Sequence, residues 1–250
     1  MSDTSSNRSA LRPFVILEAF RAAGRPLLLS EIARLTDIPV STCHGVLRAL
    51  AEAGFLYFLS SKEAYPTRRL LDMAIQIDKK DPIVSSLAPD LEALRNLTRE
   101  TVVLATLQGE RAVKLLTVES DQHIRYASPP GDSRALHSSA LGKAMLAAMS
   151  VQERKRAIGA IKFTAQTPLT ITSHEAFRAE IEKTVTRGYS VARGENSLDV
   201  MAIAMPLKVA GNSLAISVAG PRQRVEEQEA AIVAHLKRCI RTIETKIPRL

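Results

Sequence analysis

The chain of 250 residues contains no tryptophan, and aromatic residues make up only 4% of it. Its hydrophobic core must therefore be built mainly from Leu, Ile, Val and Ala, which a hydrophobic content of 46% allows. The two cysteines, Cys43 and Cys239, stand far apart, and neither belongs to a C-x-x-C pair. This usage excludes a disulfide scaffold and indicates a reducing compartment.

Long apolar runs are also missing. No stretch reaches the ~18 consecutive apolar residues of a membrane-spanning helix. The first ten residues, MSDTSSNRSA, are polar and lack the apolar segment of a secretory signal peptide. We therefore expect a soluble, cytoplasmic protein with a disordered tail over residues 1–10 and with no membrane partner.

The motifs of common enzyme classes do not occur in the sequence. Ala144 follows Gly142 and Lys143 at the position where a phosphate-binding P-loop requires Ser or Thr, and there is no G-x-S-x-G motif. Cys43 and His44 are neighbours on a predicted helix, so their side chains point apart instead of forming a nucleophile and its base. The histidines are isolated and lack the spacing of zinc ligands. We expect no enzymatic activity, no metal ion and no cofactor.

The first part of the sequence predicts two helices separated by a short extended run. Apolar residues recur at helical spacing over residues 11–23, and Gly24 is suited to end this helix. Ser30 is a candidate N-cap for a second helix, which must end before Pro39.

A third predicted helix follows directly, capped by Ser41 or Thr42 and closed by Gly54. After it come an apolar run, a polar turn and a second extended piece that ends at Pro66, which together indicate a two-stranded ribbon. Helices followed by such a ribbon are typical of a winged helix-turn-helix domain.

The third helix lies in the stretch IPVSTCHGVLRALAEAGF, whose two ends differ. Val46, Leu50 and Ala53 share one face and are predicted to be buried. Polar groups gather at the N-terminal end, which enters the major groove in a helix-turn-helix protein. There hydroxyls bond phosphates or base edges, Arg bonds guanine through two hydrogen bonds, and Gly45 would let the backbone come close. The alternative for this stretch alone is a capped surface helix without a DNA partner.

The ribbon adds cations at the places where a wing reaches the DNA backbone. Lys62 lies at its predicted tip, and Arg68 follows its second strand. The net charge of +8 fits a nucleic-acid partner, although the excess is spread along the chain. The candidate DNA-binding residues are Ser30, Ser41, Thr42, His44, Arg48, Lys62 and Arg68.

The remainder of the sequence predicts a second domain of different character. Residues 67–80 form a predicted helix, and the Pro- and Ser-containing segment 81–90 marks the junction. Beyond it, helices are mixed with strands joined as hairpins, including a third strand that starts at His123 and a final helix over residues 226–247. This mixture predicts an α+β fold on a mixed or antiparallel sheet.

The stretch LHSSALGKA contains a second candidate site. His137, Ser138 and Ser139 stand at the start of a predicted helix, where unpaired backbone amides favour a carboxylate. The alternative is that Ser138 or Ser139 only caps this helix.

Residues 11–78 resemble the DNA-binding domain of the IclR family of bacterial transcription regulators, in the stretches LEAF and PLLLSEIARLTDIPVSTCHGVLRALAEAGF and in the ribbon. TRETVVLATLQGERAVKLLTVES, PPGDSRALHSSALGKAMLA, RGYSVARGENSLDVMAIAMPL and AISVAGPRQRV are similar to the effector-binding domain of the same family. The resemblance implies a GAF-like C-terminal domain and dimers that pair into tetramers. Two departures concern the DNA face, because Gly45 stands where members usually have Arg or a bulky residue, and AYPTRRL replaces a Tyr-Arg-Leu-Gly-like sequence.

The resemblance also implies which residues bind an effector. Small carboxylate effectors of the family rest on backbone amides of one turn, here near Ala140 and Leu141. Ser217 matches a ligand-contacting serine, Ala219 stands where some members have a second serine, and Met201 replaces a cysteine of glyoxylate-binding relatives. The candidate effector-binding residues are His137, Ser139, Ala140, Leu141, Asp199, Met201, Ser217 and Ala219.

The departures at these positions bear on the effector. Asp199 lies near a position that is often apolar, and Ala192 replaces an acidic residue, so the pocket should be less polar than the glyoxylate type apart from Asp199. This favours a larger or partly apolar acid, such as an aromatic carboxylate. The alternatives are that Met201 fills the core, that Ser217 is structural and that Asp199 is a solvated turn residue.

The sequence thus predicts a transcription regulator with a tail over 1–10, a winged helix-turn-helix over 11–72, a linker helix over 73–85 and an effector-binding domain over 86–250. A dimer, or a dimer of dimers, would bind the half-sites of a double-stranded DNA operator. An effector would change the operator affinity only as far as it binds one domain arrangement better than the other. The sequence does not show the sign of this change, so the protein could be an activator or a repressor. The rival hypothesis is a metabolite-sensing module that acts through protein contacts and has a degenerate helix-turn-helix.

Overall fold

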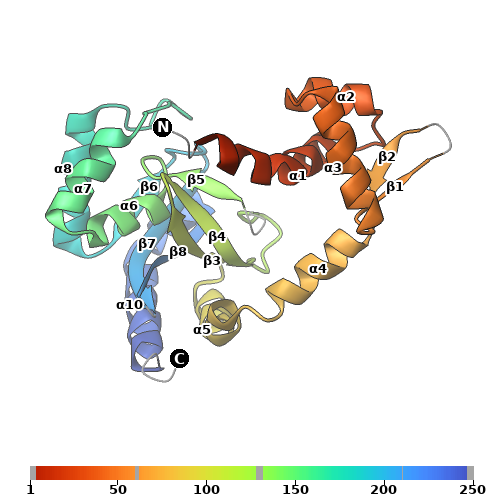
Figure 1. Cartoon of the computed structure of the whole chain (residues 1–250). Coiled ribbons are helices and arrows are strands. Elements are labelled where there is room, and N and C mark those ends of the chain that lie inside the picture. Colours follow the sequence, from red (N-terminus) through yellow and green to blue (C-terminus); the bar gives the residue numbers. More distant parts are fainter. Residues whose placement is uncertain (1–3, 60–61, 128–131, 210, 247–250) are drawn as a thin grey trace. The chain divides into compact units, whose positions relative to one another are not determined.

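The computed structural model describes the backbone of residues 4–59, 62–127, 132–209 and 211–246, and their side chains from Ser9 onward. The chain divides after Asp81 into two compact units, each with its own hydrophobic core (Figure 1). The first unit consists of helices and a small ribbon, and the second is built on a sheet. The predicted α+β class is confirmed.

The first unit contains the predicted helices and ribbon in the predicted order. Its elements are α1 (Thr4–Ala23), α2 (Leu29–Thr36), α3 (Val40–Glu52), β1 (Leu56–Phe58) and β2 (Ala64–Pro66). The two strands pair antiparallel, and apolar side chains from all five elements meet in one core. The helix-turn-helix formed by α2 and α3 is therefore held by packing against α1 and the ribbon.

α1 is longer than the apolar pattern indicated. It begins at Thr4, so residues 4–10, which were expected to lie in a disordered tail, are helical, while residues 1–3 lie outside the described residues. Of the apolar residues on this helix, Ile16 and Phe20 are buried in the core. Phe14 is 64% exposed, so one apolar side of α1 has no cover within its unit.

The predicted N-cap of α2 is wrong. The helix begins at Leu29, which places Ser30 inside the first turn. Glu31 caps the helix from its third position, because its carboxylate accepts a hydrogen bond from the Leu28 amide at 2.9 Å. The same carboxylate accepts a hydrogen bond of 2.7 Å from Arg25.

The predicted N-caps of α3 are wrong for a related reason. The helix begins at Val40, directly after Pro39, so Ser41 and Thr42 lie within its first turn. The restricted φ of Pro39 suits the residue that precedes a helix, and no side-chain cap is present at this position.

One side of α3 is buried in the core of the first unit. Cys43 and Leu47 are fully buried, and Val46 and Leu50 are half-buried. Ala53 is exposed, contrary to the prediction, because it lies just beyond the last helical residue.

Two helices stand where one linker helix over 73–85 was predicted. α4 (Arg69–Asp78) ends before the division between the units, and α5 (Pro82–Thr98) starts after it. Pro82 suits the first position of a helix, whereas Pro89 lies inside α5. α5 continues through Pro89 because its apolar side chains are buried against the sheet, namely Leu87, Leu91 and Leu94.

Among the described residues of the second unit, six strands form one antiparallel sheet in the order β5-β4-β3-β8-β7-β6. This confirms the predicted antiparallel arrangement. The strands are β3 (Thr101–Gln108), β4 (Arg111–Val118), β5 (Ser133–Ala135), β6 (Ser190–Arg193), β7 (Val200–Val209) and β8 (Asn212–Pro221).

The strand predicted to start at His123 is wrong, because the edge strand β5 begins only at Ser133. The chain before it makes hydrogen bonds to side chains instead of a neighbouring strand. Thr101 Oγ1 donates to the Tyr126 carbonyl at 2.6 Å, and Arg224 donates to the Ile124 carbonyl at 3.0 Å.

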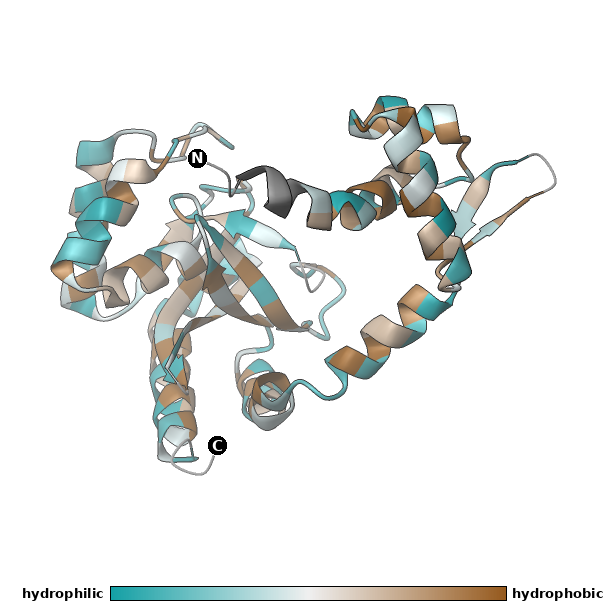
Figure 2. Cartoon of the chain, viewed as in Figure 1, coloured by the Kyte–Doolittle hydropathy of each residue, from teal (hydrophilic) through white to brown (hydrophobic). Residues whose placement is uncertain are grey.

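Helices cover both faces of the sheet (Figure 1). α5, α9 (Arg222–Glu227) and α10 (Glu229–Lys246) pack on one face, and α6 (Ala140–Ala148), α7 (Val151–Ala160) and α8 (His174–Arg187) pack on the other. Figure 2 shows hydrophobic residues along the strands and hydrophilic residues on the outer turns of α7 and α8. The final helix predicted over 226–247 is two helices separated at Gln228, and residue 247 lies outside the described residues.

Candidate functional site

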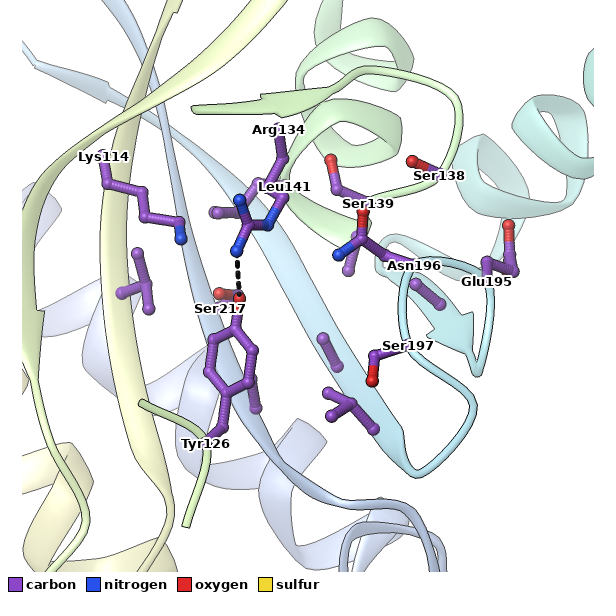
Figure 3. Close-up of a pocket in the computed structure, with 16 residues that line it drawn as sticks. Lys114, Tyr126, Arg134, Ser138, Ser139, Leu141, Glu195, Asn196, Ser197 and Ser217 are labelled. Atoms are coloured by element: carbon purple, nitrogen blue, oxygen red, sulfur yellow. Dashed lines mark hydrogen bonds between the residues drawn. The ribbon is translucent and has the colours of Figure 1, made fainter. Parts of the chain in front are cut away.

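A cavity of about 50 Å³ lies in the second unit, on the face of the sheet that α6 covers (Figure 3). Space of this size holds roughly three to five water molecules, so it suits a small ligand. The lining comes from the sheet, the start of α6, the loop after β6 and the segment before β5. The lining residues are Val103, Lys114, Tyr126, Arg134, Ser138, Ser139, Ala140, Leu141, Ala192, Glu195, Asn196, Ser197, Val200, Ala202, Ser217 and Ala219.

The first turn of α6 forms one wall of this cavity. Ser139 is the N-cap, since its Oγ accepts a hydrogen bond from the Gly142 amide at 3.1 Å and donates one to the Ala135 carbonyl at 2.8 Å. A helix leaves its first amides without internal partners, which here are those of Ala140 and Leu141. These amides and the positive end of the helix dipole favour an anion at this wall.

The approach of α6 depends on the glycine in its first turn. A Cβ atom at Gly142 would overlap the Cα and carbonyl oxygen of Leu136. Only glycine therefore allows the start of the helix to lie this close to the preceding chain.

The register of the sheet places the two predicted site residues of β8 beside other residues that line the cavity. Ser217 on β8 lies opposite Val103 on β3, and Ala219 lies opposite Ala202 on β7. Ala202 in turn lies opposite Ala192 on β6. All five residues line the cavity, and small side chains on this face leave room for a ligand.

Met201 is not in the cavity, contrary to the prediction. It is fully buried in the core on the opposite face of the sheet, with Ile203 and Met205 as neighbours on its strand. Successive residues of a strand point to opposite faces, so Met201 points away from the cavity that its neighbour Ala202 lines.

Two other predicted effector residues lie elsewhere. Asp199 is exposed, and it lines a separate surface hollow with Arg222 and Glu226. His137 is buried, with Nε2 3.0 Å from the Thr164 carbonyl oxygen and its ring edge-on to Phe163. Neither side chain lines the cavity.

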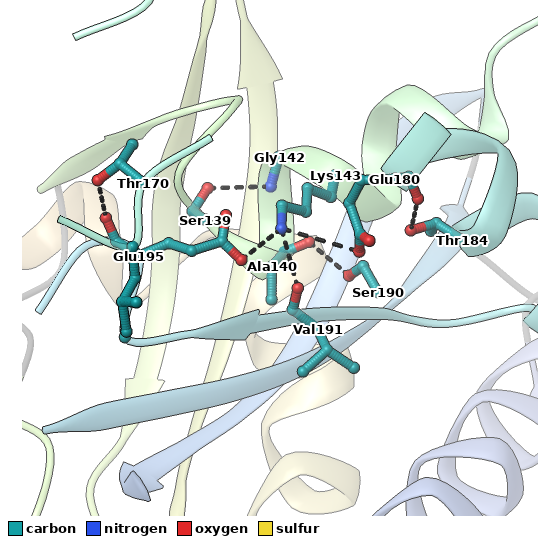
Figure 4. Close-up of polar contacts among 12 residues, drawn as sticks. Ser139, Ala140, Gly142, Lys143, Thr170, Glu180, Thr184, Ser190, Val191 and Glu195 are labelled. Carbon is teal, nitrogen blue, oxygen red and sulfur yellow. Dashed lines mark hydrogen bonds and ion pairs between the residues drawn. The ribbon is translucent and has the colours of Figure 1, made fainter. Parts of the chain in front are cut away.

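A buried ion pair ties α6 to the loop behind the cavity (Figure 4). Lys143 is fully buried, and its Nζ donates to Glu195 Oε1 at 2.6 Å and to the Val191 carbonyl at 3.0 Å. Glu180 Oε1 lies 3.8 Å from the same Nζ. Burial raises the pKa of Glu195, and the neighbouring Lys143 charge only partly offsets this effect. The Lys143 ammonium therefore joins α6 to β6 and to the loop after it at the cavity wall.

The lining also contains two cations that the sequence analysis missed. Lys114 on β4 and Arg134 on β5 both pair with Asp132, at 3.0 Å and 2.6 Å. Burial raises the pKa of Asp132, but the Lys114 hydrogen bond and the charges of Lys114 and Arg134 bring it below its ordinary value. A second Arg134 nitrogen lies 3.4 Å from the Tyr126 hydroxyl. The available signal was Lys114 itself, a charged residue between the apolar pairs Ala112–Val113 and Leu115–Leu116.

An exposed stripe runs along α3 in the first unit. Ser41, His44, Gly45 and Arg48 are all exposed and recur three or four residues apart, as neighbours on one helix face do. Thr42 is half-buried beside this stripe. The stripe is the part of α3 that a DNA groove could reach.

A groove beside this stripe brings several predicted DNA-binding residues together. Ser30, His44, Arg48 and Lys62 line it. Arg48 Nε donates a hydrogen bond of 2.7 Å to Glu52. Both side chains are exposed, so this ion pair is weak and Arg48 can exchange it for another partner. The apolar part of the lining consists of Leu28, Leu29, Val40, Leu47, Phe58 and Leu59.

Arg68 is separate from this groove. It lines another surface hollow with Arg69 and Gln76, at the start of α4. The roles of Arg68 and of all the groove residues in DNA binding stay predictions.

The described part of the chain contains neither a metal-binding cluster nor a membrane-spanning helix. No group of three or more His, Cys, Asp or Glu side chains there could hold a metal ion. None of the helices in that part combines the length and the apolar character needed to cross a membrane.

Comparison with known proteins identifies both units. The model of the bacterial transcriptional regulator IclR C-terminal domain matches residues 76–245, and the model of the IclR helix-turn-helix domain matches residues 9–60. The HTH-type transcriptional regulator BhcR of Paracoccus denitrificans is 32% identical over 230 residues, which cover 90% of this chain and 81% of that protein. The probable transcriptional regulator SauR of Cupriavidus necator is 30% identical over 203 residues, 81% of each chain.

A solved structure shares the fold. An IclR homologue from Microbacterium hydrocarbonoxydans complexed with 4-hydroxybenzoate has a TM-score of 0.80 at 23% identity, covering 97% of this chain and 100% of that one. The family models and the curated relatives span both units, and the chain belongs to the IclR family of bacterial transcriptional regulators.

Proposed function

We propose that this regulator binds a double-stranded operator through α3 and the ribbon, and that a small carboxylate effector in the cavity of the second unit changes its operator affinity. The observation that carries the first part is the exposed stripe of Ser41, His44, Gly45 and Arg48 on the second helix of a helix-turn-helix. This is the helix that such proteins place in the major groove.

The contacts divide into two kinds. Arg48 and His44 are long enough to reach base edges, whereas Ser41 near the start of α3 is placed for phosphate. Lys62 in the ribbon and Arg68 at the start of α4 are cations for the DNA backbone. Each lost phosphate contact would reduce the dependence of binding on log salt by about one unit of slope.

The effector part rests on the first turn of α6. The amides of Ala140 and Leu141 offer hydrogen-bond donors to a carboxylate, and Ser217 adds a hydroxyl from the sheet. The apolar lining supports a ligand with an apolar middle. The structural neighbour complexed with 4-hydroxybenzoate shows that an aromatic acid is one ligand found with this fold.

A dimer, or a dimer of dimers, would match the two halves of a symmetric operator. Exposed apolar side chains on α1 and α4 support such an assembly, since surfaces of this kind are normally covered. They are Leu11, Phe14 and Val15 on α1, and Leu71, Met73, Ile75 and Ile77 on α4.

The experiment that tests DNA recognition is capture of sheared genomic DNA from the host on the full-length protein at about 150 mM salt, where non-specific phosphate binding is weak. We expect enrichment of a few two-fold-symmetric sites, which Arg48→Ala abolishes. Arg21→Ala is the matched control, because Arg21 also sits in an exposed helical ion pair, with Glu18 at 2.6 Å.

Uniform recovery from the wild-type protein, repeated in the presence of cell extract, would contradict operator binding. That result would favour a sensing module that acts through protein contacts. Equal loss of enrichment in Arg48→Ala and Arg21→Ala would contradict the assignment of α3 as the reading helix.

A further inference from the structure

Four exposed apolar side chains lie around the groove beside α3. Val40 and Phe58 are each 53% exposed, and Leu28 and Leu59 are 39% and 37% exposed. They come from the residue before α2, the first residue of α3 and the ribbon, and all of them line the same groove. Single exposed apolar residues are common, but a group of them rimmed by polar side chains marks a surface that binds a partner.

The polar rim of this groove favours a polyanion as that partner. Arg48 and Lys62 contribute positive charge, and no Asp or Glu is among the described residues that line the groove. Arg48 and His44 also belong to the exposed stripe of α3, so the groove and the stripe form one continuous surface. Cations beside apolar groups fit DNA, whose phosphates are negative and whose major groove also presents an apolar group.

Val40 is the exposed apolar residue of this groove that lies on the proposed reading helix. It is the first residue of α3, one turn before His44 and two turns before Arg48. Residues four apart are neighbours on a helix surface, so the Val40 side chain lies next to His44. The N-terminal residues of the second helix are the ones that contact base edges in helix-turn-helix proteins. The apolar group that base edges present in the major groove is the C5-methyl group of thymine.

We propose that Val40 is a specificity-determining residue, whose side chain contacts the C5-methyl group of one thymine in each operator half-site. This inference rests on the proposed operator binding and names one base that the operator contains. The valine side chain neither donates nor accepts a hydrogen bond, so it distinguishes thymine from the other bases by the methyl group alone.

The test removes that methyl group and nothing else. In the operator recovered by genomic capture, each thymine of either strand is replaced in turn by deoxyuridine, at the symmetric positions of both half-sites. Deoxyuridine keeps the O4 acceptor of thymine and lacks only the methyl group. Fluorescence anisotropy with the full-length protein at about 150 mM salt measures the affinity. We expect one position at which the replacement weakens binding roughly 15-fold, about fourfold for each of the two methyl groups lost.

Variants assign this methyl contact to Val40. In Val40→Ala we expect the loss on replacing the same thymine to shrink to below about threefold, because the contact of each methyl group is gone. Val40 is exposed and alanine favours helices, so the variant should fold. Val151→Ala is the matched control, because Val151 is also the first residue of a helix and is 66% exposed, in the second unit. It should keep the full discrimination.

Equal affinity for thymine and deoxyuridine at every position would overturn the contact and leave operator binding standing. That result would favour a protein as the partner of the groove. Discrimination that persists unchanged in Val40→Ala would also overturn the contact, because another side chain would then meet the methyl group. Half-sites without any thymine would do the same. A wild-type protein that enriches no operator would refute this inference and operator binding together.

Discussion

Lys143 and Glu195 form a buried ion pair, with 2.6 Å between Nζ and Oε1, that joins α6 to the loop after β6. Glu195 itself lines the candidate effector cavity, and Lys143 follows two residues after Leu141, which also lines it. The pair therefore decides whether the first turn of α6 and the loop of Asn196 stay in place.

We expect Lys143→Met to destabilise the second unit by about 3–5 kcal/mol, because it leaves the Glu195 carboxylate buried without its counter-charge. Urea unfolding followed by circular dichroism measures the loss. The double variant Lys143→Met with Glu195→Gln should recover part of it, since the second change removes the stranded charge. A double variant less stable than Lys143→Met would contradict this account.

Gly142→Ala should be destabilising by a few kcal/mol, roughly the cost of overpacking, because the added methyl group meets the backbone of Leu136. Gly159→Ala is the matched control on α7, where nothing lies within 4 Å of the added Cβ. It should stabilise its helix by about 0.5–1 kcal/mol. Thermal unfolding distinguishes the two, and equal effects of both substitutions would refute the close approach of α6.

Gly45→Ala separates folding from DNA binding. Gly45 lies in the exposed stripe of α3 with nothing within 4 Å of an added Cβ, so alanine should stabilise the helix by about 0.5–1 kcal/mol. If the backbone at this position approaches DNA closely, the same methyl group should weaken operator binding. Thermal melts and DNA titration measure the two effects. A variant that gains stability and keeps its full operator affinity would show that this backbone does not approach DNA.

The stability of α2 should depend on pH through Glu31. Its hydrogen bonds from Arg25 and from the Leu28 amide lower the pKa of Glu31 to about 2. Between pH 4.5 and pH 2 the unfolded chain therefore binds a proton that the folded chain does not, so acidification favours unfolding. The contribution is complete above pH 4.5 and is lost as the pH falls through about 2.

Hydrogen exchange of the α2 amides, corrected for intrinsic rates, measures this effect in the full-length protein. We expect protection to decrease on acidification, and to decrease less in Glu31→Gln. Identical acid dependence of the wild type and Glu31→Gln would contradict the capping role of the carboxylate.

Helices and strands were predictable where a hydrophobic pattern repeats along the chain. Their ends were less predictable, because a single contact can determine where a helix starts. The helical spacing in α3 and the hairpin of β3 and β4 follow from local periodicity. The start of α2 does not, because Glu31 caps it from within, and no rule that searches for a preceding Ser finds that arrangement.

The cavity shows the same limit. The first turn of α6 and Ser217 were found, since one depends on a helix start and the other on the family resemblance. Met201 was misplaced because a shift of one residue on a strand exchanges the two faces of a sheet. Lys114 and Arg134 were missed because they meet only through pairing of β4 with β5, an edge strand of three residues that the sequence does not mark.

The alternation along β3 has a mechanical consequence. Val103 lines the cavity. Val102 and Leu104 point to the reverse side of the sheet, where they share a hydrophobic core with Leu87 and Leu91 of α5. The thickness of one strand thus separates the cavity from α5. In the chain, α5 follows α4 after only three residues. Because the reverse side of β3 is close-packed against α5, a displacement of this strand toward α5 would have to move that helix.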